Sequence, residues 1–263
     1  MTYEALTLDI EGGVATITLN RPEAANSLNQ AMALDLMNAS IECSKNQEIR
    51  AAVLTGSGSF FCAGGDLKSF QAVGVENISS HILQTTTYLH AAISRFARMD
   101  APLIGAINGI AAGAGASLTL MCDLAIGADS MLFTMAYTAA GLVPDGSSTY
   151  FLPRVVGLRR AAELMITNRR LSAEECLEWG IVNKVVAADQ VLAEAQGLAK
   201  QLAEGSTGAY GGVKKMLAVS FDNGLETQME VESQQIASAA ASADGQEGIN
   251  AFIAKRKPNF PSR

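Results

Sequence analysis

Aromatic side chains are scarce in this chain: they make up 6% of its 263 residues, whereas apolar residues as a class reach 49%. A sizeable core must therefore be built from aliphatic side chains and methionine, and the length fits one large domain or one domain with an appendage. The sequence has no low-complexity tract and no run of like charge. Acidic residues outnumber basic ones by 26 to 19, for a net charge of -7, which argues against a protein that binds nucleic acid.

Residues that commonly bind metals are few and badly spaced. The two histidines, His81 and His90, are nine positions apart, and none of the four cysteines forms a C-x-x-C pair. We therefore expect no metal site. The cysteines fit reduced structural thiols, which favours a cytoplasmic protein. The acidic, alternating N-terminal stretch does not read as a secretion signal.

One uncharged stretch is long enough to raise the question of a membrane span. It runs from Leu103 to Met121 without a charged residue. Pro102 precedes it, and Asn108-Gly109 is a turn signal in its middle, which membrane-spanning helices avoid. We therefore expect a buried strand, a tight loop and a buried helix, and no membrane partner.

Short apolar runs alternate with helical patterns in most of the chain. We expect strands at 3–10, 14–19, 50–55, 102–107 and 123–127, and helices at 29–46 and 78–98. This alternation predicts an α/β fold with a mainly parallel sheet covered by helices. Farther along, Ser172 and Glu175 form a capping box, and Gly180 ends that helix.

From about residue 188 onward the pattern is entirely helical. The expected helices cover 188–203, 207–219, 224–241 and 244–256. We therefore divide the chain into a core, residues 1–200, and a C-terminal helical lobe, residues 201–263.

Two glycine-rich loops follow buried strands. The first runs from Phe60 to Leu67 and the second from Asn108 to Ser117. Glycine lets the backbone approach a ligand with its N–H groups pointing outward. Two such groups aimed at one oxygen would form an oxyanion hole. Taken alone, each loop is equally compatible with an ordinary tight turn.

A third loop, from Gly141 to Ser148, places Asp145 after a proline between apolar stretches. Aspartate in such a loop is commonly a turn former or a helix N-cap. It is also a candidate catalytic base. The loop sequence by itself leaves both interpretations open.

Together these segments resemble the crotonase (enoyl-CoA hydratase/isomerase) family over nearly the whole chain. The matching segments are 63–67, 108–115, 122–123, 141–145 and 251–256, in the family's order. The resemblance implies the crotonase (ClpP/crotonase-like) spiral of β-β-α units with a C-terminal helical trimerisation lobe. It also implies an acyl-CoA thioester as substrate, a homotrimer or a dimer of trimers, and no cofactor apart from the coenzyme A of the substrate.

The resemblance also implies roles for individual residues. The amide N–H groups of Gly65 and Ala114 would hold the thioester oxygen as it gains negative charge. Other positions match residues that bind the substrate, with the last two reaching the coenzyme A of a neighbouring subunit: Ala24, Ala63, Asp66, Leu67, Lys68, Tyr137, Phe252 and Lys255. We also expect Met135, Phe70 and the loop 71–80 to line the acyl pocket. An exposed lysine is more often simply solvated.

The departures from the family pattern favour one chemistry. Hydratases of the family use two glutamates, because adding water requires groups that activate water and supply a proton. The matching positions here hold Ser117 and Tyr137, whose hydroxyls are poor bases at neutral pH. We therefore predict an isomerase in which Asp145 removes a proton and returns it at another carbon. The sequence is most similar to the branch that contains 2-(1,2-epoxy-1,2-dihydrophenyl)acetyl-CoA isomerase.

His90 keeps a second chemistry open. In the 4-chlorobenzoyl-CoA dehalogenase of the same family, a histidine and an aspartate at matching positions activate water and attack the ring. That enzyme has a tryptophan at the position of Tyr137 and an aromatic residue at that of Gly65, which disfavours this interpretation. The alternatives are thus a dehalogenase or hydrolase with Asp145 as nucleophile and His90 as base, a hydratase-like enzyme, and a non-catalytic acyl-CoA-binding module.

Overall fold

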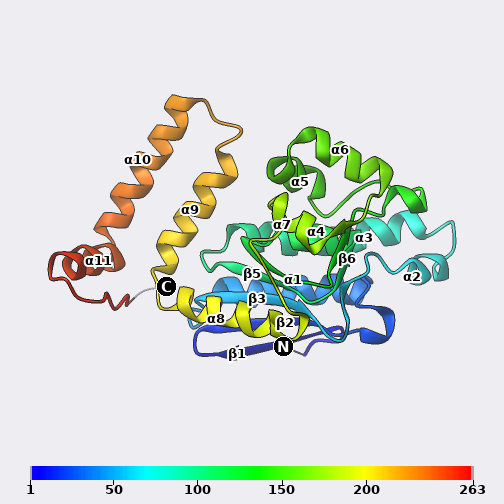
Figure 1. The fold of residues 1–263 in the computed structure, drawn as a ribbon, viewed down its shortest axis with the longest axis horizontal. Coiled ribbons are helices and arrows are strands. Elements are labelled where there is room, and N and C mark those ends of the chain that lie inside the picture. Colours follow the sequence, from blue (N-terminus) through cyan, green and yellow to red (C-terminus); the bar gives the residue numbers. More distant parts are fainter. Residues whose placement is uncertain (1, 262–263) are drawn as a thin grey trace.

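The computed structural model describes residues 2–261, which fold around two sheets (Figure 1). The larger sheet has six strands in the order β1-β2-β3-β5-β7-β10. These strands are β1 (Leu6–Glu11), β2 (Val14–Leu19), β3 (Ala51–Gly56), β5 (Leu103–Ile107), β7 (Leu124–Ala128) and β10 (Lys184–Val186). Strands β1 and β2 form an antiparallel hairpin, and all other neighbours are parallel. The mainly parallel sheet is therefore confirmed.

The smaller sheet is made of four short strands in the order β4-β6-β8-β9. They are β4 (Phe60–Cys62), β6 (Ile110–Ala112), β8 (Leu132–Thr134) and β9 (Leu171–Ser172). The pairs β3-β4, β5-β6 and β7-β8 each place one strand in the larger sheet and the next in the smaller one, before a helix follows. This repetition confirms the spiral of β-β-α units. The hydrophobic pattern did not reveal the second sheet, because strands of three residues are too short to show a period.

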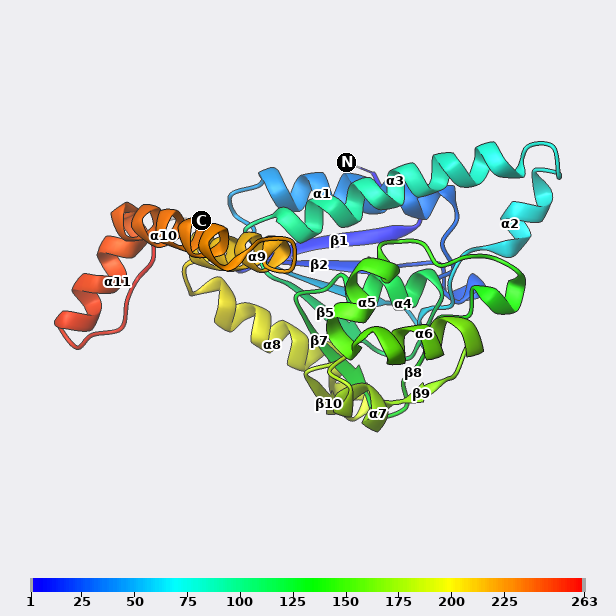
Figure 2. The same cartoon turned by 90° about the horizontal axis from the view of Figure 1, so that it is seen from above.

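Helices cover both faces of the larger sheet. Helices α1 (Gln30–Lys45) and α3 (Ile78–Arg98) pack together on one side, and α8 (Val191–Ala203) lies on the other (Figure 2). The remaining core helices are α2 (Leu67–Ala72), α4 (Ala114–Leu120), α5 (Ser148–Val156), α6 (Leu158–Thr167) and α7 (Ala173–Glu178). The uncharged stretch 103–121 is the expected strand, turn and helix, with β6 inserted between turn and helix. Within residues 2–261, no helix has the length and apolar character needed to cross a membrane.

The C-terminal helices α9 (Thr207–Val219), α10 (Leu225–Ala241) and α11 (Ala243–Ile253) project from the core (Figures 1 and 2). Lys214 anchors α9 to the core, since its Nζ lies 2.7 Å from Asp123 Oδ2 and also donates to the carbonyl oxygen of Phe96. Only 9% of the Lys214 side chain is exposed. Burial raises the pKa of Asp123, and the Lys214 ammonium opposes that rise. Removing one member of such a buried ion pair leaves an uncompensated charge, so this pair fixes where the helices leave the core.

The turn at Asn108-Gly109 depends on a close backbone approach. A Cβ at Gly109 would overlap the carbonyl oxygen of Ser59, while Asn108 Nδ2 donates to the Gly58 carbonyl at 2.9 Å. Gly109→Ala is therefore expected to lower the free energy of unfolding by about 2–3 kcal/mol, through overpacking against a backbone that cannot move aside. Urea denaturation measures this change.

The matched control for that substitution is Gly197→Ala on α8. Apart from its two chain neighbours and the nearby backbone of its own helix, no atom lies within 4 Å of a Cβ built at Gly197. Because alanine favours helix over glycine, this variant is expected to gain about 0.5–1 kcal/mol of stability. Equal stability of Gly109→Ala and the unsubstituted protein would contradict the account of the turn.

Candidate active site

A cavity of about 300 Å³ lies where the loops after β4, β6 and β8 meet α3. Most of its lining is apolar. The lining residues are Leu28, Ala63, Gly64, Gly65, Leu67, Phe70, Ile82, Thr85, Thr86, Leu89, Gly113, Ala114, Ala136, Tyr137, Ala140, Leu142, Val143 and Asp145. Among these residues, Asp145 provides the one carboxylate. The cavity thus combines apolar walls with a few polar groups, as small-molecule sites do.

The two predicted oxyanion-hole amides both line this cavity. Leu28 N donates to Gly64 O at 2.7 Å, and Asp66 N donates to Leu28 O at 2.9 Å. In this parallel bridge the N–H of Gly65 points to the opposite side, and it has no acceptor among the described residues. Ala114 is the first residue of α4, where the backbone N–H has no partner within the helix. Both N–H groups are therefore available to a ligand.

Two glycines hold these amides close together. Gly64 and Gly113 belong to the loops after the paired strands β4 and β6. A Cβ at Gly113 would lie 3.4 Å from Gly64 Cα, and a Cβ at Gly64 would lie 3.1 Å from the Ala112 carbonyl oxygen. Both glycines also have positive φ, of 108° for Gly64 and 51° for Gly113. Side chains here would push the two loops apart, so glycine brings the Gly65 and Ala114 amides to one site.

Asp145 is held from two sides. The Tyr137 hydroxyl donates to its Oδ1 at 2.7 Å. Its carbonyl oxygen accepts from Ser148 Oγ at 2.8 Å and from Ser117 Oγ at 3.0 Å. The next residue, Gly146, has φ 58°, and a Cβ there would lie 2.9 Å from Ser117 Cβ. Because the Ser117 side chain is small, the loop can pass close to it, and Asp145 stays at the cavity wall.

The hydroxyls at the two positions where family hydratases carry glutamate form a short chain. Ser117 Oγ lies 2.9 Å from Tyr137 Oη, and Ser117 is completely buried. Burial raises the pKa of Tyr137 far above its ordinary value, and the nearby Asp145 carboxylate adds to the rise. Tyr137 is therefore a neutral hydrogen-bond donor at physiological pH and no base.

His90 lies beside the loop that carries Asp145 and outside the cavity lining. Its Nε2 accepts a hydrogen bond from Gly146 N at 3.3 Å, and its side chain is otherwise exposed on α3. Between described residues, no hydrogen bond joins His90 to the Asp145 carboxylate. The imidazole is thus placed to support the loop backbone.

The other predicted substrate-binding residues are divided between the cavity and its surroundings. Ala63 and Leu67 line the cavity. The Asp66 carboxylate caps α2 and pairs with Arg21 at 3.0 Å, so its position is explained by the fold. Lys68 is exposed on α2, and Ala24 lies in the 3-10 helix Pro22–Ala24. That helix touches the first glycine loop, because Ala63 N donates to Ala25 O at 3.0 Å.

Phe252 and Lys255 lie far from the cavity of their own chain. Phe252 is the second-last residue of α11, which lies apart from the core (Figure 1), and 86% of it is exposed. Lys255 follows with φ 54° and is also exposed. The structure therefore brings neither residue to the site within a single chain.

Part of the predicted acyl pocket was wrong. Phe70 and Tyr137 line the cavity, but Met135 is completely buried in the core, and the loop 71–80 contributes no lining residue. One face of α3 lines the cavity instead, through Ile82, Thr85, Thr86 and Leu89. These positions follow the i, i+3, i+4, i+7 spacing of a single helix face, which is a signal the sequence carried.

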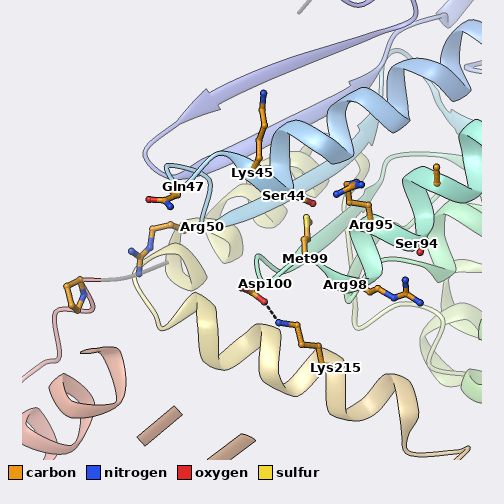
Figure 3. Close-up of a pocket in the computed structure, with 12 residues that line it drawn as sticks. Ser44, Lys45, Gln47, Arg50, Ser94, Arg95, Arg98, Met99, Asp100 and Lys215 are labelled. Carbon is orange, nitrogen blue, oxygen red and sulfur yellow. Dashed lines mark hydrogen bonds and ion pairs between the residues drawn. The ribbon is translucent and has the colours of Figure 1, made fainter. Parts of the chain in front are cut away.

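A larger pocket of about 1000 Å³ lies at the opposite end of α3 (Figure 3). Its wall is strongly basic, with Lys45, Arg50, Arg95, Arg98 and Lys215. Arg50 is bound to the carbonyl oxygens of Ala203 and Gly205, and Lys215 pairs with Asp100 at 2.8 Å. Among the described lining residues, Asp100 provides the one carboxylate, and Lys215 already pairs with it. The apolar cavity at Asp145 is therefore the candidate active site.

Known proteins of one family are similar to this chain over nearly its whole length. Residues 9–263 match the family described as enoyl-CoA hydratase/isomerase. The chain belongs to the enoyl-CoA hydratase/isomerase family. One family relative, the 1,2-epoxyphenylacetyl-CoA isomerase of Escherichia coli, is 39% identical over 97% of each chain. Another, a 4-chlorobenzoyl coenzyme A dehalogenase of an Arthrobacter species, is 36% identical over 92% of this chain and 88% of its own length.

A solved structure of the family superposes closely on this one. The enoyl-CoA hydratase of a Polaromonas species has a TM-score of 0.92 with 34% identity, over 98% of this chain and all of its own. Family members with isomerase, dehalogenase and hydratase names thus share this fold at similar identity. Fold and family membership alone therefore leave the reaction open, and the side chains of the site must decide it.

Proposed function

We propose that this member of the enoyl-CoA hydratase/isomerase family is an isomerase that moves a carbon–carbon double bond within an acyl-CoA thioester. One observation carries the proposal. A single carboxylate, Asp145, lines the cavity together with the amides of Gly65 and Ala114, while the positions of the two hydratase glutamates hold hydroxyls. A proton shuttle needs one base, whereas hydration needs groups for both water and proton.

The proposed reaction transfers one proton. Asp145 takes a proton from C2 of a 3-enoyl-CoA, and the C–H electron pair becomes part of a dienolate whose negative charge rests on the thioester oxygen. The N–H groups of Gly65 and Ala114 stabilise that charge. Asp145 then returns the proton to C4, so the double bond moves to C2–C3 and the composition of the substrate is unchanged. The apolar walls strengthen these electrostatic interactions by excluding water.

The geometry gives less support to the alternatives. A hydratase-like reaction would need Ser117 or Tyr137 to act as a base, but Ser117 is buried and Tyr137 is a neutral donor. A dehalogenase or hydrolase would need His90 to activate water beside Asp145, but its Nε2 is bound to Gly146 N. A non-catalytic acyl-CoA-binding module would have no use for an aspartate held by a buried hydroxyl.

We further propose a homotrimer, alone or as a dimer of trimers, in which Phe252 and Lys255 reach the coenzyme A bound to a neighbouring subunit. The projecting helices support this, because they expose large apolar residues that an oligomer would cover. These residues include Phe221, Leu225, Met229, Ile236, Phe252 and Ile253. The proposal includes a cytoplasmic location and no cofactor, nucleic-acid partner or membrane partner.

A substrate panel read by product mass and ultraviolet absorbance tests the reaction class. With a 3-enoyl-CoA we expect an unchanged mass and the new absorbance of a conjugated thioester. With a 2-enoyl-CoA we expect no gain of water, and with 4-chlorobenzoyl-CoA no release of chloride. Hydration would instead establish a hydratase, and chloride release would establish the dehalogenase with His90.

A further inference from the structure

We propose that the Tyr137 hydroxyl is a positioning residue that holds Asp145 by one carboxylate oxygen and leaves the other oxygen free to move the proton. The inference rests on the proposed function, since it takes Asp145 as the reacting carboxylate. It gives a role to Tyr137, whose side chain takes no part in the proton transfer itself.

The phenol ring is fixed at the cavity wall by its own backbone. Tyr137 immediately precedes the 3-10 helix Thr138–Ala140, and its carbonyl oxygen accepts from Ala140 N and Leu142 N, each at 3.0 Å. The residue before it, Ala136, has φ 53°, which reverses the chain after β8. This turn directs Tyr137 to the cavity while Met135 stays in the core.

The Tyr137 hydroxyl donates its hydrogen bond to the Asp145 carboxylate. An ionised carboxylate only accepts hydrogen bonds, so the bond of 2.7 Å runs from Tyr137 Oη to Asp145 Oδ1. Ser117 Oγ, 2.9 Å from Tyr137 Oη, is then the donor to the phenol oxygen. Ser117 can give up its longer contact with the Asp145 carbonyl oxygen, because Ser148 donates to the same oxygen through both Oγ and N.

This arrangement treats the two carboxylate oxygens differently. Oδ1 is bound by Tyr137, whereas no described residue donates to Oδ2. A carboxylate held at one oxygen has little freedom to rotate, so Oδ2 stays at a defined place for both proton transfers.

Few other ionisable groups face Asp145. Tyr137 reaches it from the turn after β8, and His90 reaches the neighbouring Gly146 N from α3. Between residues 2 and 261 the carboxylate forms no ion pair. The phenol is thus the main ionisable side chain that holds the carboxylate in place.

The decisive variant is Tyr137→Phe, assayed on a 3-enoyl-CoA. We expect kcat to fall on the order of tenfold and KM to change by less than about twofold, because the ring still fills the wall. Ser117→Ala, which removes support from the phenol, should lower kcat in the same way but by less.

Tyr150→Phe is the matched control. Tyr150 Oη donates to the Ala218 carbonyl oxygen at 2.8 Å, away from the cavity. This loss of a phenol hydroxyl should leave kcat and KM unchanged. For Tyr137→Phe, an unchanged kcat would overturn the proposal. A fall in kcat with an equally large rise in KM would also overturn it, because it would indicate a merely structural role.

Failure of this inference is distinguishable from failure of the proposed function. If Asp145→Asn is inactive while Tyr137→Phe behaves like the unsubstituted enzyme, only the role of Tyr137 is wrong. If Asp145→Asn retains full activity, the proposed reaction is wrong, and the positioning role is overturned with it.

Discussion

Replacing Asp145 with asparagine is expected to lower kcat on a 3-enoyl-CoA by roughly 10³- to 10⁴-fold, near the upper end of what one general base contributes. Asparagine has almost the same shape, and its amide oxygen can still accept the hydrogen bond from Tyr137, now 2.7 Å from Oδ1. It cannot accept and return a proton. The loss should therefore lie in the chemical step, with the pocket and the oxyanion-hole amides preserved.

Binding and turnover must be measured together for this variant. Calorimetric titration with an unreactive acyl-CoA thioester should give a Kd within about threefold of the unsubstituted protein, since the change removes no predicted binding contact. Asp189→Asn, at an exposed site in the 3-10 helix Ala188–Gln190, controls for the loss of one negative charge. Full turnover by Asp145→Asn would show that Asp145 is not the proton shuttle.

Replacing Ala114 with proline is expected to lower kcat by roughly 10²- to 10³-fold, the usual cost of one lost oxyanion donor. Proline has no N–H, so the site would keep the Gly65 amide alone. Ala114 is the first residue of α4, a position where proline is well tolerated because its N–H has no partner within the helix. The fold should therefore survive the change.

Ala114→Gly is the matched control, because glycine changes the side chain and retains the N–H. It should keep kcat within about threefold, since Ala114 is only 4% exposed and carries a single methyl group. Circular dichroism establishes that both variants are folded. A folded Ala114→Pro enzyme with full activity would exclude this amide from the oxyanion hole.

Sequence patterns predicted five of the six strands of the larger sheet and missed the short β10. The Gly12-Gly13 turn, with φ of 56° and 81°, joins the hairpin as expected, and the apolar run at 50–55 is the fully buried β3. The helices at 29–46 and 78–98 also lie within a residue of α1 and α3. These elements are long enough for their hydrophobic period to be read from the chain.

The arrangement around Asp145 could not be read in the same way. Its loop contains three residues with positive φ, Gly141, Gly146 and Ser147, so no regular period relates one side chain to the next. The Tyr137–Asp145 bond spans eight positions of this irregular chain. Its partner Ser117 comes from α4, and only the folded chain brings the three together.

A proton shuttle differs from reactions that consume water in the source of the product's oxygen atoms, and turnover of a 3-enoyl-CoA in water enriched in heavy oxygen tests this most directly. Hydration and hydrolysis would both place a water oxygen in the product, whereas a shuttle by Asp145 would not. We predict a conjugated 2-enoyl-CoA that contains no heavy oxygen. A product that carries heavy oxygen would contradict the proposed function.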